Sequence, residues 1–184
     1  MEKKKLIKDI LFVLSIIVTT LAVLFTICFI TDRPRTFTTL KDFKRAGGSC
    51  DFEIPEGAYD CRYAYKQPIF LSQQSLYSFV LEENDYNEYI KAIEGEYKLP
   101  NPTSEHGYGH WYHMKVSDCK APNHGSTMFN DFPVQLPFEK VTDTPIEDYT
   151  IIVYYPMGTG TTSYGLLVKP EEYRIVCYRF NAIR

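Results

Sequence analysis

The sequence predicts an α+β fold in which one N-terminal transmembrane helix precedes a single domain. Three observations support this prediction. Residues 10–30 form an uncharged apolar run, residues 84–94 repeat apolar side chains at helical spacing, and residues 149–180 hold three β-rich segments separated by short turns. One amphipathic helix and a run of neighbouring strands are typical of an antiparallel sheet covered by a helix.

The apolar run Ile10–Ile30 contains 21 residues without charge, proline or glycine. As a helix with a rise of about 1.5 Å per residue it measures about 31 Å, which matches the roughly 30 Å hydrocarbon core of a bilayer. Its threonines can bond to carbonyls of their own helix. The alternative is a cleaved signal peptide, but the run is longer than the usual apolar region of about 7–15 residues, and no small-x-small cleavage site follows it. The sequence therefore predicts an uncleaved anchor.

The orientation of this helix is not decided by counting basic residues, because Lys3, Lys4, Lys5 and Lys8 precede it and five further basic residues follow closely. A short basic tail is normally retained in the cytoplasm, whereas a long domain crosses largely regardless of its charge. We therefore expect a single-pass protein of the cell membrane. Its cytoplasmic tail is residues 1–9, its helix 10–30, its stalk 31–49, and its extracytoplasmic domain 50–184.

The charge of the exterior part excludes some partners. Without the four lysines and two acids of residues 1–30, the chain's 20 basic and 23 acidic residues leave 16 and 21, a net charge of about −5. This balance argues against nucleic acid or an anionic membrane surface as a main partner, although the basic residues just after the helix could meet lipid headgroups. The expected partners are the membrane, through Ile10–Ile30, and a protein or another component of the cell envelope.

Four of the five cysteines lie in the exterior part: Cys50, Cys61, Cys119 and Cys177. An even number of cysteines outside the cytoplasm predicts two disulfides, and the sequence leaves all three pairings open. The alternative is four reduced, buried thiols, which would follow if the orientation were reversed.

The first half of the domain contains two extended segments and a helix. A short helix at 39–46 in the stalk should end at Gly47-Gly48. Tyr59–Lys66 alternates aromatic and polar residues as a strand does, and residues 69–82 form a second extended run. Residues 84–94 are predicted as a helix with an Asp85/Glu88 capping pair, ended by Gly95. Its apolar face is Tyr86, Tyr89, Ile90 and Ile93.

The second half is predicted to be mostly sheet. Residues 111–118 can form a strand, and the proline-rich residues 119–147 are expected to lack regular structure. The segments 149–155, 163–169 and 173–180 are rich in β-branched and aromatic residues. They predict a three-strand antiparallel meander.

Three segments follow one another in the domain: Ile54-Pro55-Glu56-Gly57-Ala58-Tyr59 leads into an aromatic strand, Asp85–Ile90 lies in a helix, and Asp148–Tyr154 precedes a last strand. In this order, over roughly residues 53–180, the chain resembles an uncharacterised family of small proteins of Gram-positive bacteria that are exported and tethered to the membrane. The resemblance implies a location in the cell envelope and a single small domain. It implies no catalytic residue.

All four histidines, together with one cysteine, fall in the short stretch His106, His110, His113, Cys119 and His124. Imidazole and thiolate are the usual ligands of zinc and copper. No known ligand spacing fits, and on a strand His110 and His113 would point to opposite faces. Exposed loop histidines are the preferred interpretation, so no cofactor is predicted, and a zinc or copper site is kept as the alternative.

The sequence contains no catalytic motif. Gly158–Thr162 resembles a phosphate-binding loop, but a strand rather than a helix follows it, which indicates a hairpin turn. No nucleophile elbow occurs, and the adjacent acids Glu82-Glu83, Glu147-Asp148 and Glu171-Glu172 would face opposite ways on a strand. The leading hypothesis is a non-enzymatic binding or interaction module. The alternatives are a metal-binding or metal-dependent domain built on residues 106–124, and an immunity-type protein that protects against a toxin.

Overall fold

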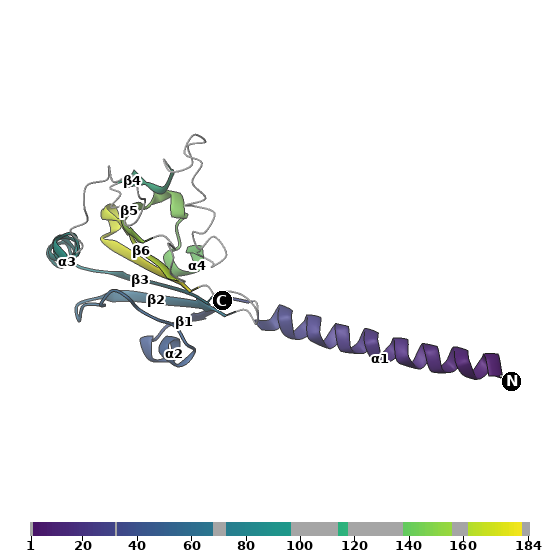
Figure 1. Ribbon diagram of the computed structural model, residues 1–184. Helices are drawn as coiled ribbons and strands as arrows, with labels where there is room; N and C mark the ends of the chain where they lie inside the picture. Colours follow the sequence, from purple (N-terminus) through teal and green to yellow (C-terminus); the bar gives the residue numbers. More distant parts are fainter. Residues whose placement is uncertain are drawn as a thin grey trace.

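The computed structural model describes residues 2–31, 33–67, 73–96, 114–117, 138–155 and 162–181. Its first element is α1 (Glu2–Thr31), which projects away from the rest of the chain (Figure 1). Within it, Ile7–Ile30 is long and apolar enough to cross a membrane. The most apolar part of this stretch has no residue buried against the rest of the described structure. Thr19, Thr20 and Thr26 donate to the carbonyls four residues earlier, at 2.8–2.9 Å. The helix is therefore compatible with a membrane anchor or with a signal sequence.

The described residues of the domain form one seven-stranded antiparallel sheet with strand order β1-β2-β3-β7-β6-β5-β4. The strands are β1 (Arg35–Phe37), β2 (Tyr59–Lys66), β3 (Gln73–Val80), β4 (Met114–Lys115), β5 (Thr150–Tyr155), β6 (Thr162–Lys169) and β7 (Arg174–Asn181). The helices are α2 (Leu40–Arg45), α3 (Glu83–Glu96) and α4 (Phe138–Thr142), with short 3₁₀ turns η3 (Ile146–Asp148) and η4 (Pro170–Glu172). The α+β fold predicted from the sequence is confirmed.

The predicted meander is confirmed as well. β5, β6 and β7 are neighbours, and each pairs antiparallel with the next. Because β6 begins at Thr162, the residues after Gly158-Thr159-Gly160 enter a strand, and the helix that a phosphate-binding loop needs does not follow them. The alternation predicted for Tyr59–Lys66 gives strand β2 with the predicted bounds.

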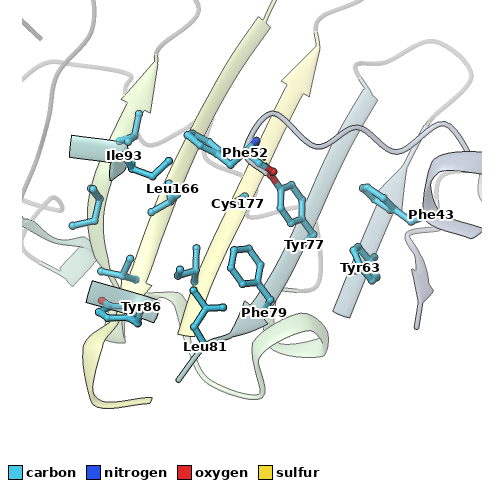
Figure 2. Packing of buried hydrophobic residues seen from close by; sticks show 14 of the residues in the cluster. Phe43, Phe52, Tyr63, Tyr77, Phe79, Leu81, Tyr86, Ile93, Leu166 and Cys177 are labelled. Atoms are coloured by element: carbon cyan, nitrogen blue, oxygen red, sulfur yellow. Dashed lines mark hydrogen bonds between the residues drawn. The ribbon is translucent and has the colours of Figure 1, made fainter. Parts of the chain in front are cut away.

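Each face of the sheet carries its own core. On one face, α2 and α3 cover aromatic side chains that include Tyr63, Tyr77 and Phe79 (Figure 2). On the other face, Phe138 and Val141 of α4 pack against Leu76, Tyr149, Leu167 and Val176. The strand period of two sends Leu76 and Tyr77 to opposite faces, so β3 is buried on both sides.

The residues expected to be a stalk contribute two elements to the fold. Strand β1 pairs with Tyr63–Tyr65, and helix α2 inserts Phe43 into the core, where its exposed fraction is 0%. Thr39 caps α2 by accepting from the Asp42 amide at 3.2 Å. Gly47 follows the helix with φ +101°, a conformation that glycine adopts without strain. The packed domain therefore begins before residue 50.

Two helical predictions differ from the structure. Helix α4 lies inside residues 119–147, where no regular structure was expected. Five residues are too few to show a helical period, and α4 is held by packing of Phe138 and Val141. Helix α3 begins at Glu83, before the predicted Asp85 cap, because the Tyr86 amide already donates to the Glu82 carbonyl at 2.8 Å. It also runs through Gly95 to Glu96.

An ion-pair network fixes the start of β2 to β7. Asp60 accepts hydrogen bonds from Arg174 and from Arg62, and Arg62 also pairs with Asp143 beside α4. Burial alone would raise the pKa of Asp60, but the hydrogen bonds from Arg174 and Arg62 outweigh it and lower that pKa below its ordinary value. The side chain of Arg174 is 8% exposed, so this guanidinium depends on its partners.

We expect Asp60→Asn to destabilise the protein by about 1 kcal/mol at pH 7, a figure reduced for the partial exposure of Asp60. Asparagine tolerates the φ of +44° at this position, so the change removes charge and leaves the backbone conformation accessible. A carboxyl with a lowered folded-state pKa stabilises above its ordinary pKa and loses that effect as the pH falls. Urea unfolding should therefore separate the two proteins at pH 7 and less so below about pH 4. A difference independent of pH would contradict this account.

Candidate functional site: an acidic groove beside α3

A groove of about 560 Å³ runs between residues 51–55 and the second half of α3. Its walls combine three carboxylates with aromatic and apolar side chains. The lining residues are Asp51, Phe52, Glu53, Pro55, Tyr89, Ala92, Ile93 and Glu96. A volume of this size lies within the range of about 300–1,000 Å³ that is typical of ligand sites.

One wall is fixed to the sheet through the backbone of residues 49–52. The Phe52 amide donates to Tyr77 Oη at 2.9 Å, and the same hydroxyl donates to the Phe52 carbonyl at 2.9 Å. The Ser49 amide donates to Ser75 Oγ at 3.1 Å. Figure 2 shows the Tyr77 hydroxyl pointing toward the backbone of Phe52. These bonds satisfy the backbone of a segment that has no regular structure, so the wall has a defined position.

The other wall is α3, which Tyr89 links to the first. Its ring meets Phe79 edge to face, with centroids 5.7 Å apart. Its Oη donates to the Glu53 carbonyl at 2.9 Å. Ile93, one turn further along the helix, is buried to 7% exposure, whereas Ala92 is exposed. Tyr89 therefore connects the two walls of the groove. Ala92 is exposed and lines the groove beside it.

The electrostatic character of the groove is negative. Asp51 pairs with Arg179 through Oδ1, and its buried Oδ2 has no hydrogen-bond partner among the described residues. Burial raises the pKa of Asp51 above its ordinary value, although the Arg179 charge acts in the opposite direction. Glu96 is the last residue of α3, and the last turn of that helix holds no basic residue, so carboxylate and helix dipole have the same sign there. Among the described residues, no lysine or arginine lines the groove.

The sequence did not identify this groove. Tyr89 was assigned to the apolar face of its helix, which is correct, but its second role at Glu53 depends on a segment far away in the chain. One local signal was present: Asp51, Glu53 and Glu56 are close together, and no basic residue follows Lys91 in α3.

The predicted metal ligands His106, His110, His113 and His124, together with Cys119, lie outside the described residues. Within the described part of the chain, no group of three histidine, cysteine or acidic side chains is placed to hold a metal ion. The zinc or copper hypothesis stays a prediction about residues 106–124.

The described exterior cysteines, Cys50, Cys61 and Cys177, are free thiols, so the two predicted disulfides are not formed among them. Cys61 lies on β2 and Cys177 on β7, and β3 runs between these strands. Two strand spacings amount to about 10 Å, which is more than the roughly 7 Å Cα limit of a disulfide. Burial raises the pKa of Cys50 to about 11 and also raises the pKa values of Cys61 and Cys177, which disfavours a nucleophilic role.

No protein-family model, curated protein or solved structure matches this chain. The resemblance to small tethered proteins of Gram-positive bacteria therefore stays a prediction, and the groove geometry alone carries the functional argument.

Proposed function

We propose that the protein is a single-pass, membrane-anchored binding module whose domain lies outside the cytoplasm, and that the groove beside α3 binds a cationic, partly apolar segment of a partner protein. The observation that carries this proposal is the lining of the groove, in which three carboxylates flank aromatic walls. The length and apolar character of α1 support the anchor. The basic residues before it support a cytoplasmic N-terminus.

The chemistry of the lining favours lysine or arginine side chains as ligands. Both carry an apolar stem that can lie along Phe52, Pro55 and Ile93, and a charged end that can reach a carboxylate. Asp51 adds a third carboxylate to this lining, paired with Arg179 through Oδ1. The exposed Glu53 and Glu96 would add weaker, salt-dependent attraction.

The proposal can be tested by titrating the full chain, held in nanodiscs of zwitterionic lipid, with fluorescent peptides of equal length. One peptide alternates lysine with leucine, and the other replaces every lysine by glutamate. We expect the lysine peptide to bind, with an affinity that falls as salt rises, and the glutamate peptide not to bind. Equal binding of both peptides would contradict the proposal.

The contribution of the groove itself can be measured with charge-neutral variants in the same titration. Glu53→Gln combined with Glu96→Gln should weaken binding of the lysine peptide by about twofold to thirtyfold, since each of the two exposed pairs contributes about 0.2–1 kcal/mol. Glu88→Gln combined with Glu139→Gln is the matched control, because both residues are exposed and lie outside the groove. The control should bind as the wild type does. An equal loss in both double variants would indicate attraction by net charge alone.

A further inference from the structure

A second, smaller pocket of about 90 Å³ lies where the chain leaves α1 and enters the sheet. It is lined by Arg33, Arg35, Ala46, Tyr65 and Gln67. Among these described lining residues, the two charged ones are arginines. We propose that this pocket binds the phosphate of an anionic phospholipid headgroup, an inference that rests on α1 being a membrane anchor.

The two arginines are held at the pocket by neighbouring elements. The Arg33 guanidinium lies over the ring of Phe29, with Cζ 4.6 Å from the centroid, so the last turn of α1 positions it. Arg35 lies in β1 directly opposite Tyr65 of β2, and directly opposed residues project from the same face of a sheet. Among the described residues, neither guanidinium is paired with a carboxylate.

The described lining of the pocket is rich in N–H donors. Tyr65 Oη donates to Gln67 Oε1 at 2.7 Å. This hydrogen bond uses the hydroxyl proton of Tyr65 and one lone pair of the Gln67 amide oxygen. The two guanidinium groups and the amide nitrogen of Gln67 supply only N–H donors. Guanidinium groups match phosphate oxygens in pairs of parallel hydrogen bonds, so a phosphate fits this donor set better than a cation or a neutral ligand.

The position of the pocket along the chain indicates where the phosphate comes from. Arg33 follows Ile30, the end of the apolar stretch, by three residues, and its amide donates to the Ile30 carbonyl at 3.5 Å. The headgroup layer on each side of a bilayer is roughly 5–7 Å thick, so Arg33 and Arg35 would lie within it. Residues 31–45 carry five basic and two acidic residues, and this excess attracts an anionic lipid surface.

The experiment is native mass spectrometry of the full chain in detergent, titrated with phosphatidylglycerol, with phosphatidylcholine and with inorganic phosphate. We expect phosphatidylglycerol to bind in preference to phosphatidylcholine. Arg33→Gln combined with Arg35→Gln should weaken the binding of phosphatidylglycerol roughly 25-fold, which is about fivefold for each arginine removed. The matched control is Lys41→Gln combined with Arg45→Gln, which removes the same charge from exposed positions outside the pocket and should change binding far less.

Three results would overturn the assignment. An equal loss in both double variants would show diffuse attraction rather than a pocket. Displacement of phosphatidylglycerol by inorganic phosphate at equal concentration would indicate a soluble anion as the ligand. Equal binding of both lipids would exclude recognition of the headgroup charge. The anchor is tested separately, by flotation of the full chain with vesicles of phosphatidylcholine alone. A chain that does not float with these vesicles would show that α1 is not an anchor.

Discussion

Gly165→Val is expected to prevent the domain from folding. Gly165 lies in β6, where it pairs with Tyr178 of β7 and Tyr154 of β5. A Cβ atom at this position would lie 2.4 Å from Tyr178 Cε1 and 2.7 Å from the Val153 carbonyl oxygen. The Tyr178 ring is 1% exposed and Val153 belongs to the paired backbone, so neither can move without breaking the sheet. Adding atoms to a packed core usually costs about 1–3 kcal/mol of stability. A clash with the backbone costs more, because the sheet itself must then move.

The measurement is the far-ultraviolet circular dichroism and the urea midpoint of the full chain in detergent. Gly165→Val should remove a large part of the free energy of unfolding, which is roughly 5–15 kcal/mol for a typical domain. Gly95→Ala is the matched control, because a Cβ atom there meets nothing within 4 Å and the residue lies inside α3. Alanine should stabilise that helix by about 0.5–1 kcal/mol. A folded Gly165→Val protein with a wild-type midpoint would show that the sheet is not packed as described.

Val18→Arg combined with Leu21→Arg is expected to abolish membrane insertion. Both residues lie near the middle of Ile7–Ile30 and are exposed in the structure. An arginine at the centre of a spanning helix costs about 2.5–3.5 kcal/mol, so the pair costs roughly 6 kcal/mol, or about four orders of magnitude in the insertion equilibrium. Carbonate extraction of cell membranes should release the variant and retain the wild type.

The control for this pair is Ile7→Arg combined with Ile30→Arg, at the two ends of the same stretch. Arginines there can extend to the interface, so the protein should remain in the membrane. The intact mass of the extracted wild type separates the two interpretations of α1, because an anchor keeps residues 1–30 and a signal peptide loses them. Retention of the central double variant in the membrane would contradict the anchor.

The elements that the sequence predicted correctly are those with a local pattern. Tyr59–Lys66 alternates over eight residues, and α3 repeats Tyr86, Tyr89 and Ile93 at helical spacing. The elements that were missed depend on distant partners. β1 is a strand because three residues pair with Tyr63–Tyr65, and α4 is a helix because Phe138 and Val141 find a buried site. No pattern within three or five residues encodes such a partner.

The groove was not predictable for the same reason. Asp51 and Glu96 lie at opposite ends of the segment that contains β2, β3 and α3, and the Phe52–Tyr77 hydrogen bonds and the Tyr89–Glu53 contact bring them together. Sequence composition drew attention to the histidines and cysteines, which are distinctive residue types. The carboxylates of the groove are ordinary surface residues until the fold places them around an aromatic wall.

The most direct test of the binding account is a reversal of charge in the groove. Glu53→Lys combined with Glu96→Lys should lose the lysine peptide and gain the glutamate peptide, because the same walls would then carry the opposite charge. Glu88→Lys combined with Glu139→Lys makes the same change in net charge outside the groove and should keep the wild-type preference. The account predicts that the ratio of the two peptide affinities inverts only in the groove variant. An unchanged ratio in that variant, or an equal inversion in both, would contradict it.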